Sequence, residues 1–167
     1  MSDTTLPQLS RILAIACRVL VIVVPVVTVI ALGLQRWDWI SGGPESTTAR
    51  LGALLVGLLP LVIFVWTLEQ MRGLFQTYAH GAVLTAEAAQ RIVDIGKGFL
   101  ALALAPLVVK PVTSVLSSLG NPRGERELVL TVDSNTFFFA LISGLLIVIG
   151  FAMRQAAEMA EDHRAIV

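Results

Sequence analysis

The feature that most constrains this chain is a set of four apolar stretches, each about as long as a bilayer is thick. They cover residues 12–34, 51–68, 99–119 and 136–153. In a helix, about 20 mostly apolar residues cross the roughly 30 Å of hydrocarbon in a membrane. Backbone groups in lipid must be satisfied internally, which helices achieve and isolated strands do not. The pattern predicts an all-α fold, an integral membrane four-helix bundle formed by one domain over residues 1–167.

Composition agrees and excludes several classes of function. The chain is 56% hydrophobic and 14% charged, against about 25% charged residues in typical soluble domains. Twelve basic and twelve acidic residues give no net charge, so the basic footprint of a nucleic-acid-binding protein is missing. The single cysteine, Cys17, excludes an internal disulfide and a cysteine zinc site. We expect no metal, no cofactor, no direct contact with nucleic acid and no catalytic residues.

The distribution of Lys and Arg predicts the orientation. With the N-terminus inside, the inner segments hold seven basic residues and the outer loops hold four. The inner set is Arg11, Arg18, Arg72, Arg91, Lys97, Arg154 and Arg164, and the outer set is Arg36, Arg50, Arg123 and Arg126. Because basic residues accumulate on the cytoplasmic side, both termini are expected in the cytoplasm.

The inner connection, residues 69–98, has the pattern of a helical hairpin. Apolar residues keep helical spacing past the second span, at Leu68, Met71, Leu74 and Tyr78. The break comes at Gly81, after which Thr85 can cap a new helix with Glu87 in its first turn. We therefore expect two membrane helices to project into the cytoplasm and turn near Gly81. Residues 154–167 extend the fourth helix in the same way.

The second outer loop contains a short strand candidate, Leu128–Val132. An isolated strand is unstable and needs a partner strand. Strand addition from another copy would supply one, which makes a homo-oligomer the expectation.

Lys110 is the clearest charged residue inside a span. It follows Phe99 by about 16 Å along the helix, near the middle of the hydrocarbon, and lies between Pro106 and Pro111. One interpretation is a group that contacts an anion or substrate in a kinked helix. The other is a lysine that snorkels outward or bonds the carbonyls that the prolines free. The four spans contain no Asp, Glu or His, so no proton relay can be drawn.

Small residues at a spacing of four predict where helices approach closely. The two pairs are Ala101 with Ala105 and Ala140 with Gly144.

The C-terminal segment has the pattern of a protein-binding surface. It presents an apolar strip with an acidic border, made of Ala156, Met159 and Ala160 beside Glu158, Glu161 and Asp162. The border would repel DNA but complement a basic protein. The hairpin adds Phe75, Tyr78, Thr85 and Glu87 on the same side of the membrane. The alternative is a solvated helix end without a partner.

Short motifs along nearly the full chain resemble one bacterial family. They are Leu9-Ser10-Arg11 before the first span, Gly81–Thr85 after Phe75, Asn121–Gly124 before the Leu128–Val132 run, and the tail Met153–Val167. The pattern resembles the membrane family described as domain of unknown function 2975. That resemblance implies a multi-pass protein of the bacterial inner membrane, often encoded beside a small helix-turn-helix regulator. It supplies no catalytic residues.

These observations lead to two functional hypotheses. The first is a non-enzymatic membrane module that binds a cytoplasmic partner and tethers or regulates a small DNA-binding regulator. The second is a small oligomeric transport or channel component that uses the proline-kinked third helix around Lys110. An integral membrane enzyme is a third and weaker alternative.

Overall fold

The computed structural model describes residues 5–41, 52, 54–81, 85–118 and 134–165. Its long helices are α1 (Thr5–Ser41), α3 (Leu59–Ala79), α4 (Ala86–Ser118) and α5 (Ser134–Ala165). These ranges contain no strand, which confirms the prediction of an all-α fold for the described part of the chain. The strand candidate Leu128–Val132 lies outside the described residues.

Each of the four apolar stretches forms part of a helix long and apolar enough to cross a membrane. The structure places these segments at Gln8–Ala31, Leu54–Ala79, Ala86–Val115 and Ser134–Ala160. The helices are longer than the predicted spans at the hairpin end of the molecule. α3 continues for eleven residues past Leu68, and α5 for twelve past Met153. Both helices therefore continue without interruption beyond the predicted spans.

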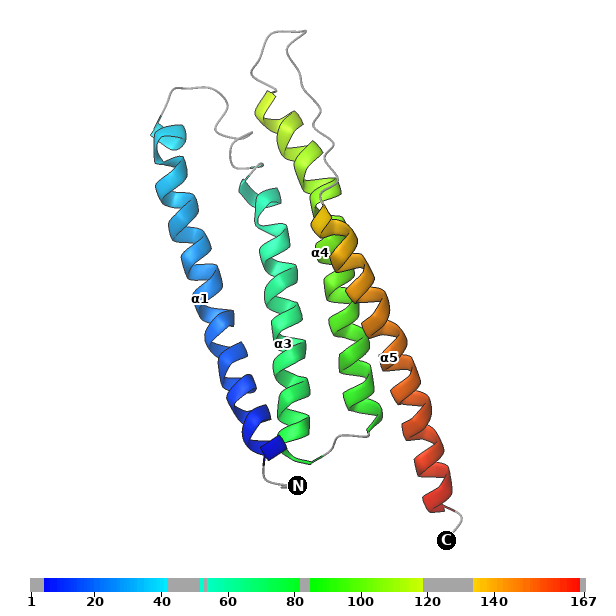
Figure 1. Ribbon diagram of the computed structural model, residues 1–167. Helices are drawn as coiled ribbons and strands as arrows, with labels where there is room; N and C mark the ends of the chain where they lie inside the picture. The colour runs from blue at the N-terminus through cyan, green and yellow to red at the C-terminus, as the bar shows by residue number, and fades with distance from the viewer. Residues whose placement is uncertain (1–4, 42–51, 53, 82–84, 119–133, 166–167) are drawn as a thin grey trace.

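The helices lie side by side in chain order (Figure 1). Extensive packing joins α1 to α3, α3 to α4 and α4 to α5, and within the described residues no other pair packs extensively. Among the described residues, α4 supplies seven of the eleven buried hydrophobic side chains, because it is covered on both flanks. The arrangement is an open row of antiparallel neighbours, and contacts among the described residues do not close it into a bundle.

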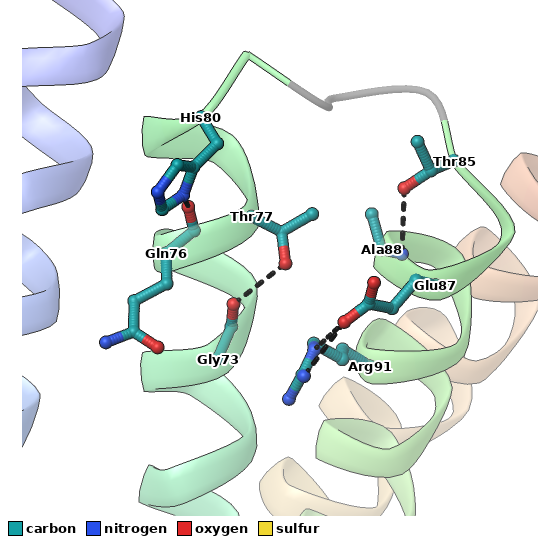
Figure 2. A network of polar contacts seen from close by, with 8 residues as sticks. All are labelled: Gly73, Gln76, Thr77, His80, Thr85, Glu87, Ala88 and Arg91. Carbon is teal, nitrogen blue, oxygen red and sulfur yellow. Dashed lines mark hydrogen bonds and ion pairs between the residues drawn. The ribbon is translucent and has the colours of Figure 1, made fainter.

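The hairpin between α3 and α4 is built by local chemistry (Figure 2). α3 ends at Ala79, and Gly81 follows with φ +80°, a conformation that suits glycine. Its amide donates to the Tyr78 carbonyl at 3.0 Å. At the start of α4 the Thr85 hydroxyl accepts from the Ala88 amide at 3.2 Å. This cap and the turn at Gly81 confirm the predicted hairpin.

A small apolar core holds the hairpin together and extends onto α5. Its buried members are Leu74, Ala88, Ile92 and Ile95, with Met71, Tyr78, Phe99, Leu146 and Met153 packed around them. Three helices therefore share one core at this end of the molecule.

The contact between α4 and α5 is a seam of small residues at a seven-residue repeat. Ala89, Gly96 and Ala103 on α4 are buried, as are Ser143, Gly150 and Ala157 on α5. A Cβ on Gly96 would lie 3.2 Å from the Ser143 carbonyl oxygen, and one on Gly150 would lie 3.0 Å from the Val93 amide nitrogen. The two backbones approach closely because side chains are small or absent there.

The small-residue pairs predicted from the sequence fit this seam only in part. Ala105 is buried, but Ala140 and Gly144 are exposed. A Cβ on Gly144 would meet nothing within 4 Å. Small residues do line the contact between α4 and α5, but the pair Ala140 and Gly144 lies on a different face of α5.

Candidate functional site

Charged side chains gather at the hairpin end and pair within single helices. Arg72 binds Glu69 at 3.1 Å, Arg91 binds Glu87 at 3.0 Å, and Lys97 binds Asp94 at 2.9 Å. On α5, Arg154 binds Glu158 at 3.0 Å. Since both members of each pair share a helix, these pairs neutralise each helix locally and do not tie the helices together.

Arg91 also fixes how α3 and α4 approach. Its guanidinium lies where a Cβ on Gly73 would be, while the same side chain reaches Glu87 (Figure 2). A side chain at position 73 would require the end of the Arg91 side chain to move. Sequence reasoning missed this contact because nothing local marks Gly73 as special.

On α1, α3 and α4, the charged residue where the apolar stretch meets the hairpin end lies at about the same height along the helix axes. The Thr67 side chain fills the space beside Gly98, so these two residues lie opposite each other on α3 and α4. Glu69 is two residues from Thr67 toward the hairpin, and Lys97 is one residue from Gly98 in the same direction. Glu69 and Lys97 therefore lie at about the same height on the two antiparallel helices. Glu69 also lies within electrostatic range of Cys17, the residue before Arg18. We call this the charge level; it is defined by Arg18, Glu69 and Lys97.

α5 does not follow this level. The Phe99 and Phe139 rings stack with centroids 5.9 Å apart, which aligns α5 with α4. We compare how far the first charged residue toward the hairpin lies from this stack on each helix. On α4 it is Lys97, two residues or about 3 Å from Phe99; on α5 it is Arg154, fifteen residues or about 22 Å from Phe139. The apolar stretch of α5 is therefore displaced by about 20 Å toward the hairpin end, as Figure 1 also shows.

This displacement leaves apolar side chains exposed beside the polar part of α4. Val148 is 66% exposed and Phe151 57%, and both lie beyond the charge level. Met159, further along α5, is 53% exposed. We call these residues, together with Ile149 and Leu145, the α5 apolar surface.

The residues predicted to bind a partner divide into two groups. Tyr78 packs on the hairpin core, Thr85 caps α4, and Glu87 binds Arg91, so these three maintain the hairpin itself. Phe75 is half-buried and Met159 is exposed. The side chains of Glu161 and Asp162 lie outside the described residues.

Lys110 lies near the end of the row opposite the hairpin. Gly98 on α4 lies beside Thr67 on α3. Lys110 is twelve residues after Gly98, and Leu55 is twelve residues before Thr67. Because the two helices are antiparallel, Lys110 lies opposite about Leu55. Leu55 is in the first turn of the described segment Leu54–Ala79. Lys110 also lies beyond the start of α5, because the Phe99–Phe139 stack places Ser134 opposite about Leu104. Lys110 is therefore opposite residues near the ends of its neighbouring helices, and along α4 it lies about 20 Å from Lys97.

The helix around Lys110 is continuous despite Pro106 and Pro111. Both prolines lie inside α4 and are partly buried, as is Lys110. The Thr113 hydroxyl donates to the carbonyls of Val109 at 2.7 Å and Lys110 at 3.1 Å. The Lys110 carbonyl therefore has a donor on its own helix. Within the described residues, no three His, Cys, Asp or Glu side chains gather as a metal site would require.

Comparison with protein-family models gave no match, and comparisons with curated proteins and with solved structures also gave none.

Proposed function

We propose that this chain is a multi-pass protein of the bacterial inner membrane whose hairpin and both termini are cytoplasmic. In this proposal it is a non-enzymatic docking module for a cytoplasmic protein. Four helices of sufficient length and apolarity support membrane insertion, and the excess of basic residues at the hairpin end supports the orientation.

The observation that carries the docking proposal is the displacement of α5. If the membrane reached Arg154, it would also enclose six charged hairpin side chains: Glu69, Arg72, Glu87, Arg91, Asp94 and Lys97. Each charge costs about 3 kcal/mol at the centre of a membrane helix, and pairing lowers that cost without removing it. Leaving Val148, Ile149 and Phe151 outside the lipid costs about 2 kcal/mol each. The charges dominate, so we place the membrane surface at the charge level. This placement leaves only Ser134–Leu141 of α5 in the hydrocarbon and puts the α5 apolar surface in the cytoplasm.

An exposed apolar surface of this kind favours a protein partner. Its contiguous helix presents an apolar strip that another helix could cover. The resemblance described above makes a small, basic DNA-binding regulator the partner that we propose. The acidic residues of the tail would complement such a protein by charge.

Capture of partners from native membranes tests the proposal with a matched pair of variants. Phe151 and Phe137 are both exposed on α5, but Phe137 lies at the other end of the helix. Phe151→Ala should weaken capture by about thirtyfold, the effect of losing about 2 kcal/mol at a central contact. Phe137→Ala should leave capture unchanged.

Deletion of Ala156–Val167 should keep the protein in the membrane and abolish capture. If the truncated chain and the Phe151→Ala variant both retain every protein that the full chain captures, α5 has no docking role.

A further inference from the structure

Arg11 and Arg18 form an exposed stripe along one side of α1. They are seven residues apart, which is two helical turns or about 10 Å along one face. Both are exposed, whereas Ser10 and Cys17, each one residue earlier, are buried. α1 is an edge helix, and its only extensive contact among the described residues is with α3. The arginine stripe is therefore exposed on the flank of α1, about a quarter turn from the face that packs on α3.

These two arginines differ from the other cations at the hairpin end. Arg72, Arg91, Lys97 and Arg154 each bind a carboxylate. Within the described part of the chain, no ion pair neutralises Arg11 or Arg18. On the neighbouring helix α3, the Glu69 carboxylate is bound by Arg72.

The surroundings of the stripe are apolar on the side that leads away from the termini. Ile22, one turn after Arg18, is 61% exposed, and Val26 continues the same face at 51%. A soluble anion would use the arginines but not this apolar face. A phospholipid would use both, because its phosphate group could contact the arginines while its attached acyl chains lie against the apolar side chains.

From these observations we infer that the Arg11–Arg18 stripe binds anionic phospholipid in the cytoplasmic leaflet. The inference rests on the membrane insertion and orientation proposed above. Arg18 belongs to the charge level and so lies at the hydrocarbon boundary. Arg11 lies about 10 Å further out, in or just beyond a headgroup layer that is roughly 5–8 Å thick. Guanidinium groups bind phosphate oxygens in pairs, while the acyl chains lie along Ile22 and Val26.

Native mass spectrometry of the detergent-solubilised full chain, titrated with phosphatidylglycerol, tests the inference. Each basic residue near an anionic surface contributes about 1 kcal/mol. The double variant R11Q/R18Q should therefore bind phosphatidylglycerol about thirtyfold more weakly than the natural chain. R11K/R18K, which keeps both charges, should retain most of the binding. Phosphatidylcholine should bind weakly and equally to every variant.

The variant E69Q/R72Q removes an ion pair from the neighbouring helix and serves as the matched control, because it should bind phosphatidylglycerol as the natural chain does. Unchanged binding by R11Q/R18Q, or an equal loss in E69Q/R72Q, would overturn the inference. So would displacement of the lipid by millimolar inorganic phosphate, or release of the chain from membranes by alkaline carbonate. If partner capture fails while the lipid preference follows the arginines, only the docking proposal is lost.

Discussion

Gly144 and Gly150 lie six residues apart on α5 and meet opposite surroundings. A Cβ on Gly150 would lie 2.5 Å from Val93 Cγ2 and 3.1 Å from the Ala89 carbonyl oxygen, while one on Gly144 would meet nothing within 4 Å. The same substitution should therefore have opposite effects at the two positions.

Gly150→Leu should destabilise the protein by about 2 kcal/mol, because overpacking at the seam exceeds the gain in helix propensity. Gly144→Leu should be neutral or stabilise by up to about 1 kcal/mol. Equilibrium unfolding in detergent micelles measures both. Equal losses at the two glycines would mean that the α4–α5 seam does not form as described.

Lys110 gives a prediction about depth rather than chemistry. It lies thirteen residues, or about 20 Å, from Lys97 along α4. In roughly 30 Å of hydrocarbon this leaves about 10 Å to the outer boundary, and a lysine side chain can extend over most of that distance. Lys110→Met should change stability by no more than about 0.5 kcal/mol, with normal expression and partner capture.

Cysteines at two positions test the same placement directly, in a chain from which Cys17 has been removed. In intact cells, Val115→Cys, about 27 Å from Lys97 along α4, should react with a membrane-impermeant thiol reagent. Lys110→Cys, about 8 Å deeper, should not. Labelling at Lys110 without labelling at Val115 would refute this placement.

At the scale of the helices, the displacement of α5 along α4 can be measured by cross-linking. With Cys17 removed, cysteines at 99 and 139 should form a disulfide readily, since the native rings stack at 5.9 Å. Cysteines at 99 and 153 should not, because fourteen residues, or about 21 Å of helix, separate 153 from 139. Efficient cross-linking of 99 to 153 would mean that the two apolar spans are aligned, which would remove the basis of the docking proposal.

The sequence predicted those features that depend on local chemistry. Gly81 ends one helix and Thr85 begins the next through contacts with residues at most four positions away, so their spacing was sufficient evidence. The lengths of the apolar stretches were likewise enough to identify four helices.

Features that depend on distant contacts could not be predicted. Gly73 is special only because Arg91 lies on it, and the seven-residue seam on α5 is no clearer in the sequence than the exposed pair Ala140 and Gly144.

The displacement of α5 also changed the candidate site. Tyr78 and Glu87 were expected to face a partner, but they support the hairpin, while Phe151 was not anticipated at all because it lies inside a predicted span.

For the whole molecule, the orientation is the prediction on which both proposals depend. With Cys17 removed, single cysteines at Gly43 and Gly124 should react with an impermeant reagent in intact cells. Cysteines at Gly81 and Ala165 should react only after the membrane is permeabilised, because the basic residues at the hairpin end favour a cytoplasmic location. Labelling of Gly81 in intact cells would reverse the orientation.

The repeat of the α4–α5 seam has a consequence for how uniquely the two helices are aligned. A pattern of small residues that recurs every seven positions presents almost the same surface after a slip of seven residues, or about 10 Å. Ser143 is buried in this seam with no hydrogen-bond partner among the described residues, so it does not select one alignment. The stacked rings of Phe99 and Phe139 contribute about 1 kcal/mol to that selection, and Leu146 and Met153 add their contacts with the hairpin core. The seam thus encodes tight contact with little information about position, and larger side chains beside it determine where along its length α5 comes to rest.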